Sequence, residues 1–401
     1  MADGLPQGER PVEKGRVESS VRIVHVSDAY LPKQGGIEVQ VHDLAQRQAQ
    51  AGHRVRVLTC APDGAATAGA GAATPPGTAA RNGDEPVAVT RVGSPWGRVR
   101  AANEAMYAVL RREQPDVVHA HLSVLSPLAI LAVRAAHRER VPVVMTLHSL
   151  WWLATPLYVA AHVLLGWGRW RVHWTAVSEL AAAPLRRVVG DRGELSLLPN
   201  GVEPLQWEVD PVDRDPRDVV VVSVMRLAAR KRPRPLLRAL RDAVDRLPHG
   251  VRLTLVVVGD GPQRERLEAD VRRLGLQEHV QLRGRMDRHG IRELYRRADV
   301  YVAPATLESF GIAALEARCA GLPVVARTRT GIADFVEDGV HGLLAPSDAA
   351  MADALVRLAA DAPLRGLIAA TNRACAPETG WNDVLQRCEL AYKVAGELTR
   401  D

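Results

Sequence analysis

Short apolar runs alternate with amphipathic helical stretches along this chain, and the alternation occurs in two successive series. Strand-like runs lie at 21–28, 53–60, 115–122, 141–148 and 173–178, and then at 219–227, 251–261, 280–284, 299–304, 322–327 and 342–346. Short β-branched runs separated by helices are typical of a parallel sheet with helices on both faces. The pattern predicts an α/β fold with two Rossmann-like, doubly wound domains, and a length of 401 residues favours two domains as well.

A Pro- and Asp-rich stretch separates the two series. We expect a disordered tail at 1–20, an N-terminal domain at 21–203, a linker at 204–218, a C-terminal domain at 219–380, and a helix at 381–401 that packs back toward the N-terminal domain. The Gly-, Ala- and Pro-rich residues 61–86 predict a flexible surface loop. Ligands of doubly wound sheets bind beyond the carboxyl ends of the strands, so we expect the site in a cleft between two facing domains.

The charge balance limits the partners that this chain can have. The formal net charge is +6, and the excess is spread along the chain without a long Lys/Arg block. This balance suits anionic ligands or an acidic membrane surface and argues against nucleic acid. The four cysteines lie far apart, and no apolar run forms a signal peptide or a clean spanning helix. We therefore expect a cytoplasmic protein with reduced thiols.

In the first domain, the segment "PKQGGIEVQ" (32–40) joins the end of a strand to a helix. Gly35 and Gly36 allow backbone N–H groups to approach a phosphate, and the helix N-terminus adds partial positive charge. Lys33, in the same loop, is one of only four lysines in a chain with 52 Lys and Arg residues. A simple tight turn would explain the glycine pair equally well.

In the second domain, "VVSVMRLAARKRPRPLL" (221–237) also follows the end of a strand. Arg226 and Lys231 lie five residues apart on a loop that enters a helix, so both can converge on one anion, although a solvated basic face is the ordinary alternative. A compact ammonium at Lys231, between two arginines, suits a point contact with a phosphate oxygen. The next strand ends in "VVVGDGPQ" (256–263), where Gly259 predicts a tight turn close to a ligand.

The segment "ESFGIAALEARCAGLPVVA" (308–326) contains one of only two phenylalanines in the chain and two glutamates eight positions apart. We expect Glu308 to precede a helix and Glu316 to lie about one turn inside it. Gly311 and Ile312 would offer N–H groups to a diphosphate, and Phe310 would wedge the loop in place. A carboxylate at Glu316 could accept hydrogen bonds from both hydroxyls of a ribose. The alternative is a helix whose first acid merely interacts with the helix dipole.

Across about residues 20–400, the chain resembles the retaining glycosyltransferases of family 4, which have the GT-B fold and use nucleotide-sugar donors. Ten pieces occur in the family's order, namely "YLPKQGGIE", "AGHRVRVLT", "PDVVHAH", "TLHS", "AVS", "LPNGVE", "RLAARK", "VVGDGP", "ADVYVAPATLESFGIAALEARCAGLPVVA" and "GVHGLLAP". The glutamate pair separated by seven residues is the family's signature. Arg318 and Cys319 replace smaller residues that are usual in this helix.

The resemblance implies a role for each matching residue. Gly36, with Gly35 beside it, would lie against the donor phosphates or the sugar, and Arg226 and Lys231 would neutralise the diphosphate leaving group. Donor contacts would also come from Gly259, Arg285, Met286, Glu308, Phe310, Gly311, Ile312 and Glu316. His148, at a strand end, would approach the sugar or the acceptor.

The chain is thus expected to be a metal-independent, retaining glycosyltransferase with a GDP- or UDP-sugar donor and no cofactor. Two alternatives remain open, a nucleotide-sugar epimerase of the same fold and a non-catalytic sugar-nucleotide-binding subunit. A metal site at Asp213 and Asp215 is disfavoured because no strand precedes this linker segment. A metal site at His119, His121 and His148 is disfavoured because histidines at strand ends more often form local hydrogen bonds.

Residues 149–174 contain five of the eight tryptophans in the chain. They could form a buried helix and loop of the N-terminal domain. Tryptophans close to Arg169 and Arg171 also form a typical interfacial set. We therefore expect an apolar or lipid-linked acceptor and peripheral contact of 149–171 with the inner face of the membrane, helped by the net positive charge.

Overall fold

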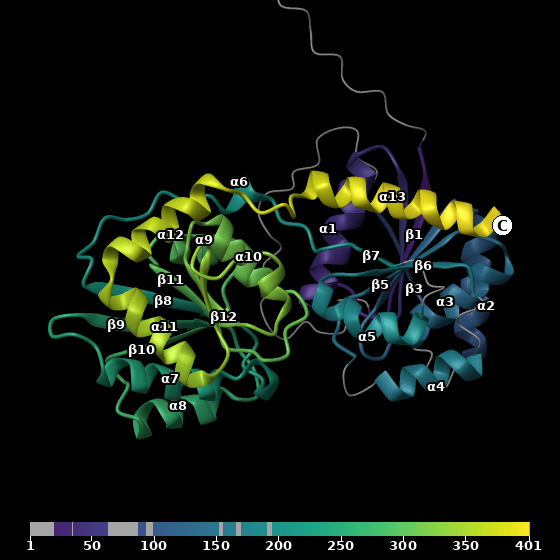
Figure 1. Cartoon of the computed structure of the whole chain (residues 1–401). Coiled ribbons are helices and arrows are strands. Elements are labelled where there is room, and N and C mark those ends of the chain that lie inside the picture. The colour runs from purple at the N-terminus through teal and green to yellow at the C-terminus, as the bar shows by residue number, and fades with distance from the viewer. Residues whose placement is uncertain are drawn as a thin grey trace, which may run out of the picture.

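The computed structural model describes residues 20–33, 35–62, 87–93, 99–151, 155–165, 170–190 and 195–400. Residues 1–19 of the expected tail, residues 63–86 of the expected loop, and the tryptophans at 152 and 167 lie outside the described residues. Two α/β domains stand side by side and are joined by two crossing segments (Figure 1). The predicted α/β fold with two doubly wound domains is confirmed.

The first sheet has seven parallel strands in the order β3-β2-β1-β4-β5-β6-β7. Their bounds are β1 (Arg22–Ser27), β2 (Arg54–Thr59), β3 (Ala88–Arg91), β4 (Val117–Leu122), β5 (Val143–Leu147), β6 (Val172–Ala176) and β7 (Leu195–Leu197). The strands β1, β4, β5 and β6 are buried almost throughout, which explains their continuous apolar runs. The sequence did not predict β3 and β7, because both are short, half-exposed strands at the edges of the sheet.

Helices cover both faces of the first sheet. They are α1 (Gly36–Gln50), α2 (Val99–Glu113), α3 (Pro127–Arg138), α4 (Thr155–Leu165) and α5 (Glu179–Val189). Met106, Leu128 and Leu185 pack α2, α3 and α5 against one face. The other face is covered by α1 and by the last helix of the chain, α13 (Trp381–Arg400), which places Ala391 and Ala395 against the strands.

The second sheet has six parallel strands in the order β10-β9-β8-β11-β12-β13. Their bounds are β8 (Asp218–Val224), β9 (Arg252–Val258), β10 (Val280–Gly284), β11 (Val300–Ala303), β12 (Val324–Arg327) and β13 (Gly342–Ala345). The strand order in this sheet repeats that of the first six strands of the other sheet. Each domain is therefore wound in the same way about its own central pair of strands, β1/β4 and β8/β11.

The helices of this domain also lie on both faces of its sheet. They are α7 (Pro233–Asp245), α8 (Arg264–Arg273), α9 (Arg288–Tyr295), α10 (Ile312–Cys319), α11 (Asp348–Ala360) and α12 (Ala362–Ala374), with the short 3₁₀ helices η3 (Ala229–Lys231) and η4 (Gly331–Asp334). Leu236, Leu267 and Leu355 bring α7, α8 and α11 to one face, whereas α9 and α10 cover the other face.

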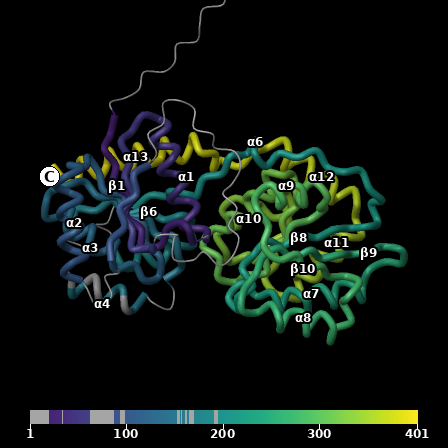
Figure 2. The backbone as a smooth tube through the Cα atoms, turned by 180° about the vertical axis from the view of Figure 1, so that it is seen from behind, coloured from purple at the N-terminus to yellow at the C-terminus, as the bar shows by residue number. Residues whose placement is uncertain are grey.

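The chain crosses between the domains twice. The first crossing contains α6 (Pro204–Trp207), whose Trp207 is buried against Tyr295 with ring centroids 5.8 Å apart. After α12 the chain returns, and α13 runs along the first domain (Figure 2). Trp381 packs onto Gly201 so closely that a Cβ atom at this glycine would lie 2.5 Å from the indole. The end of the chain is therefore anchored in the core of the first domain.

Of the five tryptophans at 149–174, the structure places Trp151 and Trp174 in the core, as in the buried alternative. Trp151 is fully buried, stacks on Tyr158 with ring centroids 3.7 Å apart, and donates its indole N–H to the Ser123 carbonyl. Trp174 is buried on β6 as well. Among the described residues, no helix is long and apolar enough to cross a bilayer.

Candidate functional site

Each sheet has a topological switch point, and the segments that leave the two switch points lie close together. In a doubly wound sheet, the crevice lies where neighbouring strands send their connections to opposite faces, here at the carboxyl ends of β1/β4 and of β8/β11. The loop to α1 follows β1, the segment with Arg226 follows β8, and the segment with Glu308 follows β11. The fold thus brings together residues that lie almost 300 positions apart.

The glycine loop of the first domain touches the second domain. Gly36 begins α1, and a Cβ atom at this position would lie 3.4 Å from Cδ1 of Ile312, the first residue of α10. Gly35 precedes the helix, and a Cβ atom there would collide with the Glu38 carboxylate at 2.4 Å. The N-termini of α1 and α10 therefore lie next to each other across the two domains. Lys33 forms an ion pair with Glu38 at 3.7 Å at the edge of this loop.

Arg226 and Lys231, both in the segment after β8, differ in their partners. Lys231 ends η3 and forms an ion pair with the Glu308 carboxylate. The Arg226 side chain is exposed and has no hydrogen bond or ion pair with any residue that the structure describes. The ammonium of Lys231 is thus held next to the β11 loop, while the Arg226 guanidinium remains available to an anion.

The loop from Glu308 to Gly311 has a rigid support. Phe310 is buried and packs against Phe335 with ring centroids 5.4 Å apart, as the wedge that the sequence suggested. Gly311 adopts a left-handed conformation with φ 93°, and a Cβ atom there would lie 2.4 Å from the Ile332 side chain. Only glycine fits this position, and its backbone directs the N-terminus of α10 into the cleft.

Glu316 lies one turn inside α10, as predicted. Burial raises the pKa of this carboxyl group from 4.5 to about 8; the positive charge of Arg288 opposes this shift, and the negative charge of Asp43 adds to it. Arg288 of α9 and Asp43 of α1 form an ion pair of 2.7 Å across the two domains. Neither residue could be predicted from the sequence, because no local motif shows that two helices about 245 residues apart meet.

The strand ends β9 and β10 complete this side of the cleft. Gly259 has φ 126°, and a Cβ atom there would lie 1.9 Å from the Met225 carbonyl oxygen, so the predicted tight turn requires glycine. Its N–H donates to the Gly284 carbonyl at 2.7 Å, next to Arg285 and Met286. Arg285 is exposed and Met286 is half-buried. Both residues can border a flat ligand beside the turn.

His148 follows β5 in the first domain and is buried with other histidines. Its Nε2 atom lies 3.0 Å from Nδ1 of His121, whereas its Nδ1 atom forms no hydrogen bond of ordinary geometry with a described residue. His148 and Asn200 line the same narrow cavity next to α1. Burial lowers the pKa of His148 to about 4, so the ring is neutral near pH 7.

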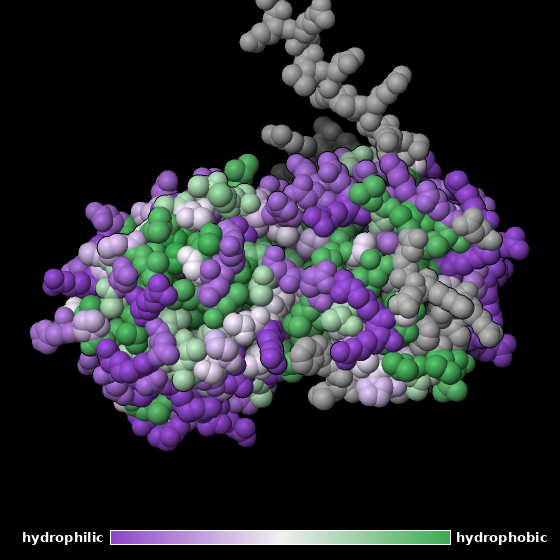
Figure 3. All heavy atoms as spheres, viewed as in Figure 1, coloured by the Kyte–Doolittle hydropathy of each residue, from purple (hydrophilic) through white to green (hydrophobic). Residues whose placement is uncertain are grey.

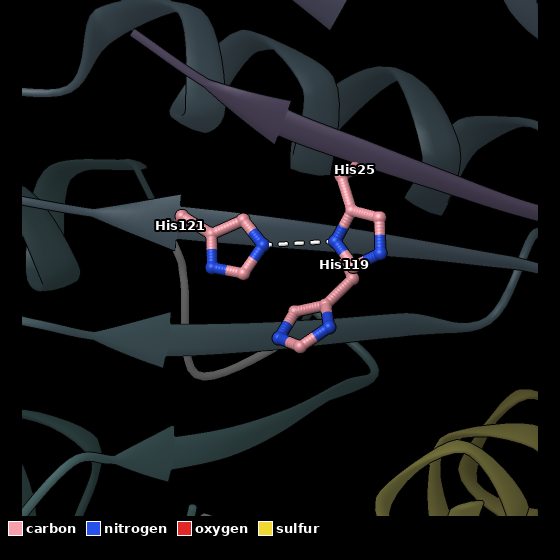
Figure 4. A group of neighbouring side chains, drawn as sticks. All are labelled: His25, His119 and His121. Carbon is pink, nitrogen blue, oxygen red and sulfur yellow. Dashed lines mark hydrogen bonds between the residues drawn. The ribbon is translucent and has the colours of Figure 1, made fainter. Parts of the chain in front are cut away.

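The rings of His25, His119 and His121 bring ring nitrogens within 4.8 Å of one another (Figure 4). Each of their nitrogens already has a hydrogen-bond partner, and the bond between His25 and His121 is 2.9 Å long. A metal ion at this site would have to displace these bonds. The alternating pattern of the strand pointed to His119 and His121 but not to His25, which pairs with His119 in the sheet register.

Other predicted features find ordinary explanations. Arg318, which departs from the family pattern, is buried and donates to the carbonyl groups of Phe335 at 2.5 Å and Cys375 at 3.4 Å. Asp213 and Asp215 lie in the first crossing segment, away from the strand ends that form the cleft. Arg318 therefore holds α10 in place through hydrogen bonds to neighbouring segments. Asp213 and Asp215 lie outside the candidate site.

Comparisons with known proteins agree with this arrangement. The model of Glycosyltransferase Family 4 matches residues 34–205, and the model of Glycosyl transferases group 1 matches residues 208–373. The chain is 30% identical to a phosphatidyl-myo-inositol mannosyltransferase of Mycobacterium leprae, over 90% of this chain and 93% of that one. A D-inositol 3-phosphate glycosyltransferase of Kribbella flavida is 35% identical over a shorter region, 45% of this chain and 44% of that one.

Solved structures show the same fold at low sequence identity. The Anabaena protein HepE in complex with UDP-glucose aligns with a TM-score of 0.72 and 20% identity, over 93% of this chain and 99% of that chain. The sucrose-phosphate synthase of Thermosynechococcus elongatus aligns with a TM-score of 0.70 and 21% identity, over 92% and 98%. With both family models matched in order along its two domains, this chain belongs to the group 1 glycosyl transferases and has the GT-B fold that its motifs predict.

Proposed function

We propose that the protein transfers a sugar from a nucleoside diphosphate donor to an acceptor hydroxyl, with retention of the anomeric configuration and without a metal ion. The observation that carries this proposal is the ion pair between Lys231, which follows β8, and Glu308, which lies just before α10; Arg226 lies in the same segment after β8. Two cations and a helix dipole there could take up the charge that develops on a departing diphosphate. HepE, with the same fold, was crystallised with UDP and with UDP-glucose.

The other site residues fit around such a donor. Glu308 would face the transferred sugar, and Gly311 and Ile312 would donate N–H groups to the phosphates, with Gly35 and Gly36 opposite. Glu316 would hold the ribose, and the turn at Gly259 with Arg285 and Met286 would border the base. Lys231 would exchange its Glu308 partner for a phosphate oxygen when the donor binds.

The proposal is tested by incubating the protein with radiolabelled UDP- and GDP-sugars, with and without a panel of polyol, glycan and lipid acceptors. Transfer of label to an acceptor, with an unchanged anomeric configuration in the NMR spectrum of the product, supports it. An epimerised donor would assign the epimerase alternative, and donor binding with neither product would assign a non-catalytic subunit. Activity that EDTA abolishes and magnesium restores would contradict the metal-free mechanism.

The role of the cations has a separate test. Lys231→Ala and Arg226→Ala are each expected to reduce turnover by about 10²–10³-fold, because each removes a preorganised donor to the transition state. Arg230→Ala, which removes an exposed arginine next to Lys231, is the matched control and should leave turnover within about twofold. Near-normal turnover of the Lys231 or Arg226 variant would contradict the assignment.

We also propose that the acceptor is lipid-linked and that α4 contacts the membrane surface. Trp151 belongs to the core, but Val163 and Leu164 on α4 are 73% and 83% exposed. Figure 3 shows hydrophobic surface where α4 lies. A basic hollow lies on the same domain; its lining includes Arg138, Arg140, Arg171 and Arg400. Exposed apolar side chains and a group of arginines on one domain favour an interface with anionic lipid. The M. leprae relative is named for a phosphatidyl acceptor.

Liposome flotation tests this contact. We expect the wild type to float with vesicles that contain anionic phosphatidylglycerol at low salt, and Leu164→Gln to bind several-fold less. Leu367→Gln on α12 of the other domain, where the leucine is 66% exposed, is the control and should float like the wild type. A wild type that stays in the soluble fraction, or equal flotation of both variants, would contradict membrane contact through α4.

A further inference from the structure

A continuous series of hydrogen bonds connects the C-terminal helix to His148. One branch runs from Tyr392 on α13 through Gln48 on α1 to the histidines of the sheet. Its bonds are Gln48 Nε2 to Tyr392 Oη at 2.8 Å, His25 Nε2 to Gln48 Oε1 at 2.6 Å, His25 Nδ1 to His121 Nε2 at 2.9 Å and His121 Nδ1 to His148 Nε2 at 3.0 Å. Figure 4 shows the link between His25 and His121.

A second branch runs from the same tyrosine into the middle of the sheet. Its bonds are Tyr392 Oη to His119 Nδ1 at 2.9 Å, His119 Nε2 to Thr146 Oγ1 at 2.7 Å, Thr146 Oγ1 to Thr175 Oγ1 at 2.6 Å, and Thr175 Oγ1 to the Met145 carbonyl at 3.5 Å. This branch ends on a backbone carbonyl, a group that can only accept.

All four histidines are neutral near pH 7. Burial lowers the pKa values of His25 and His148 to about 4, and it lowers those of His119 and His121 well below the ordinary value. A neutral imidazole has one N–H donor and one bare acceptor nitrogen. The direction of any one bond in the series therefore fixes the tautomer of every ring along it.

We take the direction from the Met145 carbonyl, a fixed acceptor at 3.5 Å from Thr175 Oγ1, which is the longest contact of the branch. Thr175 donates to the carbonyl, so Thr146 donates to Thr175 and His119 donates to Thr146 from Nε2. His119 Nδ1 is then bare and accepts from the Tyr392 hydroxyl.

The Tyr392 oxygen accepts in turn from the amide nitrogen of Gln48, which leaves the Gln48 oxygen to accept from His25 Nε2. His121 donates from Nε2 to His25, and His148 donates from Nε2 to His121. The series ends at a bare Nδ1 on His148, which forms no hydrogen bond of ordinary geometry with a described residue. The Asn200 side chain, which lines the same cavity, interacts with this ring and opposes the lowering of its pKa. A reversed Gln48 amide would reverse all of these bonds.

We propose that Gln48 and Tyr392 are positioning residues that hold His148 as its Nε2–H tautomer, so that Nδ1 accepts a hydrogen bond from a hydroxyl group of the bound sugar. Only the identity of this ligand rests on the proposed function. A bare imidazole nitrogen in a buried cavity favours a hydroxyl donor over an anion or a carbonyl group, because neither of these can donate. The C-terminal helix thereby contributes to sugar recognition without touching the sugar.

Tautomers can be read directly by NMR. In protein labelled with ¹⁵N-histidine, long-range ¹H–¹⁵N spectra distinguish Nε2–H from Nδ1–H rings, and single substitutions of the histidines assign the signals. We expect His25, His119, His121 and His148 all to be Nε2–H in the ligand-free protein. If His148 is found as Nδ1–H, the series runs in the opposite direction and the proposal is overturned.

Gln48→Met tests the role of the amide at nearly constant volume. In this variant the Nε2–H of His25 faces an apolar side chain and has no acceptor. If the bonds of this branch reverse, the N–H without an acceptor is the Nδ1–H of His148, which lies in the cavity. We therefore expect His148 to become Nδ1–H in this variant. Ser196→Ala, which breaks the bond between His173 and Ser196, is the control and should leave His148 unchanged. An Nε2–H signal for His148 in Gln48→Met would contradict the proposal.

Kinetics give a second readout, which depends on activity. Loss of an acceptor that the sugar contacts in both ground and transition states raises KM more than it lowers kcat. We expect Gln48→Met to raise the donor or acceptor KM about tenfold, with kcat within about threefold of the wild type. An altered His148 tautomer with an unchanged KM would overturn the sugar contact. If no transfer activity is found at all, the proposed function fails while the tautomer result still stands.

Discussion

At the scale of single residues, the raised pKa of Glu316 predicts how the stability of the folded protein depends on pH. Its folded pKa of about 8 lies above the ordinary 4.5, so the folded protein binds this proton more tightly than the unfolded chain does. The carboxyl group costs no stability below about pH 4.5, and the folded state loses stability as the pH rises through the window up to about 8. A neutral carboxamide at this position would escape that loss.

Glu316→Gln is therefore expected to be more stable than the wild type at about pH 8.5, by about 1–3 kcal/mol, and to differ little at about pH 5. Thermal unfolding of the ligand-free proteins at several pH values measures the difference. Glu397→Gln, an exposed position on α13, is the control. The pKa assignment is wrong if the stability of Glu316→Gln follows the same pH profile as that of the wild type.

Most residues of the candidate site were accessible to sequence reasoning, because local patterns carry them. Arg226 and Lys231 were conspicuous in a loop after a strand, and Glu308 and Glu316 were conspicuous by their spacing around Phe310 and Gly311. Their roles stay predictions until they are measured. Asp43, Arg288 and His25 were not accessible, since each matters through a partner from a distant segment.

At the scale of elements, α10 depends on the glycine before it. Gly311→Ala places a Cβ atom 2.4 Å from Ile332 in a left-handed conformation that alanine rarely adopts. We expect a loss of about 1–3 kcal/mol in the free energy of unfolding and weaker donor binding, because the N-terminus of α10 must shift. Urea unfolding and donor titration would measure the two effects.

Gly366→Ala provides a matched control for this change. Gly366 is exposed inside α12, and a Cβ atom there meets nothing within 4 Å. Alanine is the better helix former, so this variant should gain up to about 1 kcal/mol. Equal responses of the two variants would show that the strained geometry at Gly311 is not required.

At the scale of the whole molecule, the ion pair of Asp43 and Arg288 ties the two domains together across the cleft. A partly exposed pair of this kind contributes about 0.5–1 kcal/mol, enough to change the ratio of closed to open molecules by about two- to fivefold. Asp43→Arg should therefore increase the radius of gyration in small-angle X-ray scattering at low salt. The double variant Asp43→Arg/Arg288→Asp restores opposite charges and should restore the wild-type value.

A surface ion pair away from the cleft provides the control for a general effect of charge reversal on the radius of gyration. Arg100 and Glu104 form an exposed ion pair within α2, so Glu104→Arg reverses a similar charge without touching the cleft. The radius of gyration of this control should equal that of the wild type. If the Asp43 variant also keeps the wild-type radius, the pair does not hold the domains closed.

The sequence by itself determined the fold class, the two-domain division and the strands of both sheet centres, because buried parallel strands need continuous apolar runs. It did not determine the edge strands β3 and β7, whose half-exposed residues leave a weak pattern. Only the tertiary structure decided that Trp151 belongs to the core, that Asp43 meets Arg288, and that Tyr392 reaches His148 through four intermediate bonds. These features arise where distant segments pack together, and their partners are chosen by the packing rather than by any local spacing in the chain.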